Sequence, residues 1–318
     1  MLKNIRHEPK YMTDNTSPLI QPTTDRALEP AEPKPELQAA APSILLEQNN
    51  KPAESQNSAP KKDYALITGA SSGLGLAFAR ILASKKKPLI LVGKDEHKLK
   101  QISYELKDKE GIDVRFLPID LARSKDLPNL PDKLQRMGLK VDVLINNAGF
   151  GKFGPETHIR YEDALNMINL NCRATLAMTK LFLPGLLKQK KGAIINIADT
   201  AGFIPVPKLA AYAATKAFVI NYTEALAQEV AGRGVKVLCV CPSPMSTSFF
   251  TKADINTSTH QHLQQLTDPE SVVEQALTAL KTGKTLIVAG QPSFWMKIAP
   301  TLMTRSWLRK IGFGLFKN

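Results

Sequence analysis

The segment at residues 63–84 constrains the fold most, because an apolar run leads through a turn of glycines and serines into a helical pattern. DYALITG (63–69) reads as a buried strand, and the turn GASSGLG (69–75) follows it directly. Glycines permit a tight turn, and the free amide groups at the start of a helix attract an anion such as a pyrophosphate. The glycine spacing, G-x3-G-x-G, fits the common dinucleotide fingerprint only loosely. The strand–turn–helix context therefore carries the prediction of a nucleotide site.

Apolar runs and helical stretches alternate along the rest of the chain. The runs are apolar throughout, which is typical of strands buried on both faces. We predict strands at 63–69, 88–93, 114–120, 141–149, 191–199, 235–242 and 285–290, and helices at 74–87, 95–111, 124–138, 160–190, 209–232 and 269–282. This alternation predicts an α/β fold, a Rossmann-type doubly wound parallel sheet of about seven strands.

Composition divides the chain into three parts. Residues 1–62 hold nine of the 22 prolines and carry 8 basic and 8 acidic residues, so the net charge of +13 lies beyond them. Such a segment buries too little apolar surface to fold, and we expect a disordered Pro-rich tail. Residues 63–290 are the expected NAD(P)-binding domain. Residues 291–318 are basic, aromatic and free of acidic residues.

Cysteine and histidine give no sign of a metal site or a disulfide framework. Of the three cysteines, Cys239 and Cys241 lie two apart in a predicted strand and are interpreted as small buried side chains. The histidines are scattered, with His260 and His262 in a predicted loop. Reduced thiols and the lack of an apolar leader favour a cytoplasmic protein, with contact at the inner face of a membrane as the alternative.

The end of the second predicted strand indicates which nicotinamide cofactor is bound. An acidic residue there binds the ribose hydroxyls of NAD. Here Gly93 leaves that position empty, and the following Lys94 can neutralise the 2′-phosphate of NADP. Asp95 complicates the interpretation, and a solvated surface lysine is the plain alternative. We favour NADP over NAD.

Tyr212 and Lys216 are the candidate catalytic pair. Their i, i+4 spacing places both side chains on one face of a helix. A tyrosine with its ordinary pKa of about 10 is a poor acid–base at neutral pH, and a neighbouring cation lowers that pKa. Alone, this spacing is common on helix surfaces.

Together, the motifs TGASSGLG (68–75), NNAG (146–149) and YAATK (212–216) resemble the short-chain dehydrogenase/reductase family over about residues 63–250. The resemblance implies that Tyr212 is the general acid–base, that Lys216 tunes it and that Asn169 helps to organise the proton relay. It also implies homo-oligomers and a small carbonyl or alcohol substrate. With Lys94, the predicted cofactor-binding residues are Gly69, Ser71, Ser72, Gly73, Leu74, Gly75, Asp120, Leu121, Asn147, Ala148, Gly149, Tyr212, Lys216, Pro242 and Thr247.

One position departs from the family pattern. Asp199 stands where the family has a serine that donates a hydrogen bond to the substrate oxygen. An ionised carboxylate cannot donate, and it opposes negative charge developing on that oxygen. Asp199 is then protonated in a dry site, or Thr200 supplies the hydroxyl, or turnover is poor. The first hypothesis is an NADP-dependent carbonyl/alcohol oxidoreductase, and the alternative is a cofactor-binding sensor or scaffold with impaired catalysis.

Two further segments bear on partners. Residues 243–268 follow the sixth predicted strand, where the family has a mobile substrate lid, and Phe249 and Phe250 either line an apolar pocket or pack the lid down. The C-terminal segment 291–318 suits an interfacial helix on an anionic membrane, or else packs on its own domain or a partner subunit. No recognition motif accompanies the charge, so we expect no nucleic-acid binding.

Overall fold

The fold is taken from a computed structural model that describes residues 62–125, 127–247, 249–253, 255, 266–290 and 304–315. The predicted disordered tail lies outside these residues apart from Lys62, and so do His260, His262 and most of segment 291–318. Within the described part, no helix is long and apolar enough to cross a bilayer.

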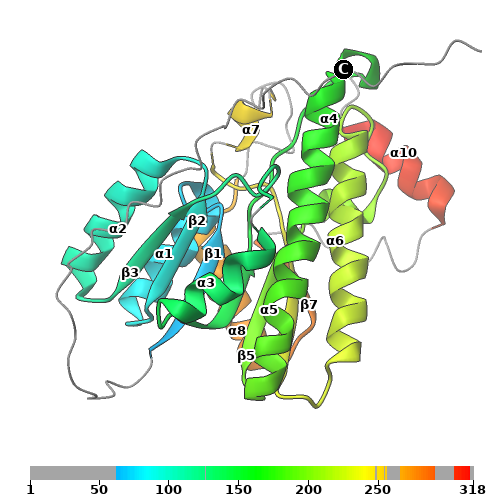
Figure 1. Ribbon diagram of the computed structural model, residues 1–318. Coiled ribbons are helices and arrows are strands. Elements are labelled where there is room, and N and C mark those ends of the chain that lie inside the picture. Colours follow the sequence, from blue (N-terminus) through cyan, green and yellow to red (C-terminus); the bar gives the residue numbers. More distant parts are fainter. Residues whose placement is uncertain are drawn as a thin grey trace, which may run out of the picture. The chain divides into compact units, whose positions relative to one another are not determined.

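A seven-stranded parallel sheet forms the centre of the domain, as the alternating pattern predicted (Figure 1). The strands are β1 (Asp63–Thr68), β2 (Leu89–Gly93), β3 (Val114–Pro118), β4 (Lys140–Asn146), β5 (Gly192–Ile197), β6 (Val235–Pro242) and β7 (Leu286–Ala289). Their order is β3-β2-β1-β4-β5-β6-β7. The order reverses between β1 and β4, which is where doubly wound sheets open a crevice for ligands. The α/β, Rossmann-type prediction is confirmed.

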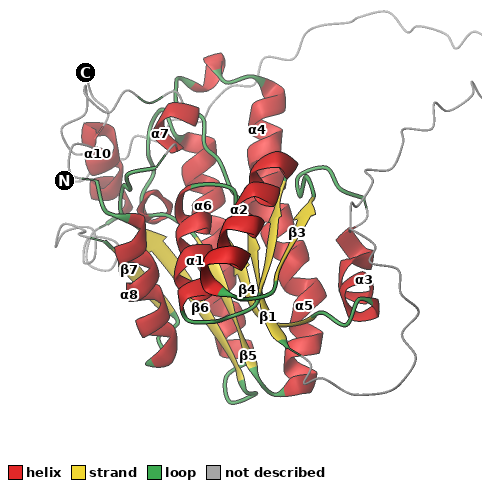
Figure 2. Ribbon diagram, turned by 90° about the vertical axis from the view of Figure 1, so that its left-hand side faces the viewer, coloured by secondary structure: helices red, strands yellow, loops and turns green. Residues whose placement is uncertain are grey.

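Helices cover both faces of the sheet (Figure 2). The α-helices are α1 (Gly73–Ser84), α2 (Glu96–Glu110), α3 (Leu130–Arg136), α4 (Tyr161–Ile168), α5 (Thr175–Gln189), α6 (Ala210–Glu229), α7 (Phe249–Lys252), α8 (Pro269–Lys281) and α10 (Arg305–Leu315). Short 3-10 turns are η1 (Leu127–Asn129), η2 (Glu156–His158) and η4 (Thr200–Phe203). Successive strand residues point to opposite faces, so Ile67 packs with α1, α2 and α8, whereas Leu66 packs with α3, α5 and α6.

The predicted helix at 160–190 is not uniform. Residues Asn169–Ala174 form a π-helical segment, η3, between α4 and α5. A π-helical turn is wider than an α-helical one and is frequent at functional sites. It changes which side chains of this stretch face the domain interior, and Asn171 is buried there.

Cys239 and Cys241 lie in the core, as interpreted from the sequence. Both side chains project from β6, are fully buried and pack against α6, and their Sγ atoms are 3.9 Å apart. The hydrogen bond with Cys239 and, after it, burial raise the pKa of the Cys241 thiol well above its ordinary value. Among the described residues, no three His, Cys, Asp or Glu side chains gather in a way that holds a metal ion.

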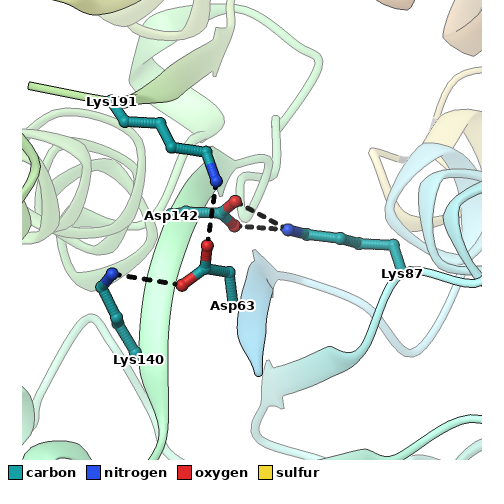
Figure 3. A network of polar contacts seen from close by, with 5 residues as sticks. All are labelled: Asp63, Lys87, Lys140, Asp142 and Lys191. Carbon is teal, nitrogen blue, oxygen red and sulfur yellow. Dashed lines mark hydrogen bonds and ion pairs between the residues drawn. The ribbon is translucent and has the colours of Figure 1, made fainter. Parts of the chain in front are cut away.

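A network of ion pairs joins the amino ends of the central strands (Figure 3). Lys87, just before β2, donates to both carboxylate oxygens of Asp142 on β4, at 2.6 and 2.8 Å. Asp63, the first residue of β1, pairs with Lys140 and Lys191 at 3.3 and 3.1 Å. Burial alone raises the pKa of Asp63, but the two lysines more than offset this and lower it.

The buried pair of this network is the stabilising one. Asp142 is buried, whereas the Lys191 side chain is 68% exposed. We expect Lys87→Met to lower the free energy of unfolding by about 2 kcal/mol, because it leaves a buried carboxylate without its cation. Lys191→Met, the matched control, should change stability little, because exposed ion pairs contribute little. Equal losses in chemical denaturation would contradict this ranking.

Candidate functional site

A cavity of about 320 Å³ lies at the carboxyl ends of the central strands. Its wall is built from the loops that follow β1 to β6. Of the residues predicted to bind the cofactor, all except Gly75 line this cavity. The topology therefore brings together residues that are up to 178 positions apart, from Gly69 to Thr247.

The glycine-rich turn is shaped by positions that require glycine. Gly69 and Gly73 have positive φ angles of 65° and 55°, a region that side chains with a Cβ disfavour. A Cβ at Gly75 would collide with the carbonyl oxygen of Gly69, so Gly75 permits α1 to pack closely beneath the turn. Gly75 thus shapes the glycine-rich turn without lining the cavity. α1 begins at Gly73, so its first amide groups lie at the cavity.

Thr68 and Asn147 hold this turn against the loop after β4. The Thr68 hydroxyl accepts hydrogen bonds from the backbone N–H groups of Asn147 and Ala148, at 2.9 and 3.0 Å. The Asn147 side-chain amide donates to the carbonyl oxygens of Thr68 and Gly69, at 3.0 and 3.3 Å. Asn147 therefore has a structural task as well as a place in the cavity wall.

The loop after β2 separates the roles of Lys94 and Asp95. Lys94 is exposed and lines the cavity. Asp95 caps α2, because its Oδ1 accepts a hydrogen bond from the backbone N–H of Lys98 at 3.1 Å, and its Oδ2 lies 3.5 Å from Lys98 Nζ. The acidic charge that complicated the sequence interpretation is thus used at a helix terminus.

Tyr212 and Lys216 face the cavity from the first turns of α6. Lys216 is buried and donates to the carbonyl oxygen of Ile197, the last residue of β5, at 3.0 Å. Its Nζ lies 5.7 Å from the centroid of the Tyr212 ring. Burial lowers the pKa of Lys216, and the nearby Asp199 charge opposes that shift.

Asp199 hydrogen-bonds directly to Tyr212. The Tyr212 hydroxyl donates to Asp199 Oδ2 at 2.8 Å, and the backbone N–H of Ala201 donates to Oδ1 at 2.7 Å. Asp199 is held in this position because it caps the 3-10 turn η4. Burial raises the pKa of Asp199, although Ala201, Tyr212 and Lys216 oppose the rise. Burial also raises the pKa of Tyr212 well above 10, and the Asp199 charge adds to that shift.

Thr200 also lines the cavity, beside Asp199. Its side chain is buried, and its hydroxyl donates to Asp199 Oδ1 across 3.4 Å. The observed hydrogen bond therefore directs this hydroxyl toward the carboxylate.

Asn171, rather than the predicted Asn169, makes the hydrogen bonds that tie this segment to α6 and to the loop after β4. Asn171 exchanges two hydrogen bonds with the backbone of Phe150 and donates to Thr215 Oγ1, at 2.9 to 3.0 Å. A Cβ added at Gly149 would lie 3.0 Å from Asn171 Oδ1 and 3.4 Å from Lys216 Nζ. Neither asparagine is among the described residues of the cavity wall, whereas Leu170 between them is, so the hydrogen bonds of Asn171 carry the distinction. The two asparagines flank Leu170 in one motif. The π-helical segment determines which of their side chains faces the domain interior.

The apolar half of the cavity was largely missed from the sequence. Phe249 and Phe250 line it, as one of the two sequence interpretations held, and the Phe249 ring centroid lies 5.3 Å from that of Tyr212. Both rings also pack in a cluster with Tyr212, so the same two side chains line the cavity and hold segment 249–252 against α6. Apolar lining residues that the sequence did not predict for the site include Phe150, Leu170, Ile197, Ile204, Val206, Leu209 and Ile255.

Comparison with known proteins gives the class of the chain. Residues 63–257 match the short chain dehydrogenase family, and the chain belongs to this family. The resemblance drawn from the three motifs is therefore confirmed.

Individual relatives are similar over part of their length. A very-long-chain 3-oxoacyl-CoA reductase of Pyrenophora tritici-repentis is 40% identical over 185 residues, which cover 57% of this chain and 54% of that protein. The Homo sapiens protein of the same name is 36% identical over 191 residues, 58% of this chain and 60% of that one. The chain thus spans less than two thirds of these relatives. A solved short-chain dehydrogenase from Sphingobium yanoikuyae, in complex with NADPH, is 31% identical with a TM-score of 0.66, and the match covers 71% of this chain and 87% of that one.

The two asparagines make a matched test of this distinction. We expect Asn171→Ala to lower the free energy of unfolding by about 2 kcal/mol, because it removes a buried side chain that satisfies the half-buried N–H and C=O of Phe150 and bonds to Thr215. Asn169→Ala should change stability much less, because no hydrogen bond of its side chain ties it to the loop after β4 in the described structure. Equal losses, measured by chemical denaturation, would restore Asn169 as a candidate.

Proposed function

We propose that the protein is an NADP-dependent oxidoreductase that transfers a hydride between nicotinamide and a carbonyl/alcohol substrate. The observation that carries the proposal is a single cavity that joins a glycine-rich turn at a helix N-terminus to the Tyr212–Lys216 pair. Relatives named as reductases and dehydrogenases favour catalysis over the alternative of a binding protein with impaired turnover.

The residues present fit a dinucleotide. Gly69 and Gly73 give the turn its shape, and both line the cavity beside the first amides of α1, where a phosphate group would bind. Lys94 would neutralise a 2′-phosphate, which is why we favour NADP. The hydroxyl of Ser243, in the loop after β6, is buried at the cavity without a hydrogen-bond partner among the described residues, and a polar group of the cofactor would satisfy it. When bound, the nicotinamide supplies or accepts the hydride.

Tyr212 would be the general acid that donates the proton. In the reducing direction its hydroxyl donates a proton to the carbonyl oxygen as negative charge develops there. A tyrosine whose pKa lies above 10 keeps its proton at neutral pH and is suited to this direction. Lys216 would place positive charge near the resulting phenolate. Asn171, through Phe150 and Thr215, would hold the loop after β4 against α6.

Asp199 would take part as a neutral acid. A protonated carboxyl donates a hydrogen bond to the substrate oxygen, as the family serine does, whereas a carboxylate competes with the substrate for the Tyr212 proton. The raised pKa of Asp199, caused by burial, favours the neutral form. This proposal also accounts for a carboxyl group at a position where a permanent negative charge would oppose catalysis.

The substrate would be largely apolar. The cavity wall includes an apolar cluster around Tyr212, formed by Phe150, Ile204, Val206, Phe249 and Phe250. Relatives named very-long-chain 3-oxoacyl-CoA reductases make a 3-oxoacyl thioester the first compound to test. The cytoplasmic location and the homo-oligomer expected from the sequence stay predictions.

Isotope transfer tests the proposed reaction directly. NADPH deuterated at C4 of the nicotinamide, incubated with a panel of 3-oxoacyl thioesters and bulky ketones, should yield alcohols with deuterium at the former carbonyl carbon. Tyr212→Phe should still bind NADPH but reduce turnover by at least about 100-fold. Tight NADPH binding with no deuterium transfer to any member would favour the alternative, a binding protein.

Lys94 should decide between the two cofactors. We expect Lys94→Ala to weaken NADPH binding about 10-fold while leaving NADH binding nearly unchanged, because only NADPH carries the 2′-phosphate. Lys98→Ala removes a neighbouring exposed cation outside the cavity wall and serves as the control. Titration by protein fluorescence measures both constants. A loss that is equal for the two cofactors would refute this role.

The protonation of Asp199 predicts an unusual pH profile. Because the neutral acid is the donor and its pKa is raised, kcat for reduction should fall as pH increases through that pKa. Asp199→Ser carries a hydroxyl that does not titrate there, so its kcat should persist to higher pH and exceed that of the wild type increasingly as pH rises above that pKa.

Thr200→Val separates this proposal from the alternative donor. If the Asp199 carboxyl donates, the variant should keep most of its turnover. Loss of reduction in Thr200→Val, or identical pH profiles for wild type and Asp199→Ser, would exclude the neutral acid as the donor.

A further inference from the structure

Helix α10 exposes aromatic side chains next to the catalytic domain. Trp307 and Phe313 are 58% and 57% exposed, which is unusual for residues of this size. On the inner side of the helix, Leu308 and Gly312 are buried. A Cβ at Gly312 would collide with the carbonyl oxygen of Pro205, so the glycine allows α10 to lie close to the segment after η4. Figure 1 shows α10 beside α6.

An apolar hollow of about 970 Å³ separates the outer part of α10 from α6. Its floor consists of small and apolar side chains of segment 202–207 and of the first two turns of α6. Phe313 borders it from α10, and Arg309 and Lys310 supply its charged rim. No acidic residue is among its described lining residues.

The charge of this surface has one sign. α10 contains Arg305, Arg309 and Lys310 and no acidic residue, and segment 291–318 as a whole has none. Lys310 Nζ lies 5.2 Å from the centroid of the Trp307 ring, so cation and indole are neighbours on the exposed side. Basic groups interleaved with exposed aromatic rings match the interface of a bilayer, where rings enter the headgroup region and cations meet anionic lipids.

We propose that α10 docks the protein on the surface of an anionic lipid bilayer. Trp307 and Phe313 would enter the interface, Arg309 and Lys310 would contact anionic headgroups, and the hollow would face the lipid. An 11-residue helix is too short to cross a bilayer, so the helix would lie along its surface. The basic side chains complement anionic headgroups, and the two exposed aromatic rings favour a lipid surface over a soluble anion.

Docking would bring the catalytic cavity next to the lipid. Ile204 and Val206 line both the hollow and the cavity, so one layer of side chains separates them. An apolar substrate dissolved in the bilayer would then lie close to the apolar half of the site. This last step rests on the proposed function, whereas the docking itself does not.

Tryptophan fluorescence of the full chain tests the docking without cofactor or substrate, so its outcome is independent of the catalytic proposal. The chain has two tryptophans, and Trp295→Phe leaves Trp307 as the single reporter. Vesicles of phosphatidylcholine with phosphatidylserine should shift its emission to the blue and co-sediment with the protein. Vesicles of phosphatidylcholine alone should do so much less.

Paired variants identify the surface. Arg309→Gln with Lys310→Gln, and separately Trp307→Ser with Phe313→Ser, should each lower partitioning by co-sedimentation about 10-fold or more. Lys98→Gln with Tyr161→Ser removes an exposed cation and an exposed ring elsewhere and should leave partitioning unchanged.

Three results would overturn the proposal. They are the absence of co-sedimentation with anionic vesicles, equal partitioning of all variants, and an emission shift caused by monomeric laurate but not by vesicles. The last would make the hollow a site for a soluble acyl anion instead.

Discussion

The hydrogen bond from the Tyr212 hydroxyl to the Asp199 carboxyl, 2.8 Å long, governs the chemistry of the cavity. Both groups titrate, and the Tyr212 hydroxyl is the donor of the bond between them. Burial disfavours the charged form of each group. The Lys216 charge opposes the rise in the pKa of Asp199, and Lys216 Nζ lies 5.7 Å from the centroid of the Tyr212 ring. The protonation of Asp199 therefore decides whether both groups can donate to a substrate oxygen or whether Tyr212 alone can, in competition with the Asp199 carboxylate.

The fold holds this pair rigidly, because each member is fixed by an adjacent element. β5 ends at Ile197, whose carbonyl oxygen accepts from Lys216, and Asp199 follows as the cap of η4. Tyr212 and Lys216 are one turn apart on α6, which packs against both β6 and η4. The first two turns of α6 also line the hollow beside α10, together with segment 202–207. The catalytic helix is thus shared by the site and the proposed membrane surface.

The sequence predicted what depends on local pattern. Seven strands, their helices and the glycine-rich turn follow from apolar runs and from glycines that a turn requires, and almost every predicted cofactor residue lines the cavity. It could not resolve what tertiary contacts decide: Asn169 and Asn171 look equivalent in the sequence, whereas the π-helical segment buries Asn171 and its side chain bonds to the Phe150 backbone. The apolar wall from Ile204 to Leu209 comes from a loop without periodicity, so no motif marked it. Asp199 was recognised as a departure, but its bond to Tyr212 required the folded chain.

The protonation state of Asp199 is the central claim, and infrared difference spectroscopy measures it directly. Spectra of the wild-type protein minus those of Asp199→Asn, recorded across a pH series, isolate the vibrations of this one carboxyl group. The account predicts the C=O stretch of a protonated carboxylic acid at a pH well above the ordinary pKa of aspartate, disappearing as kcat for reduction falls. A carboxylate band alone at every pH that supports reduction would contradict it.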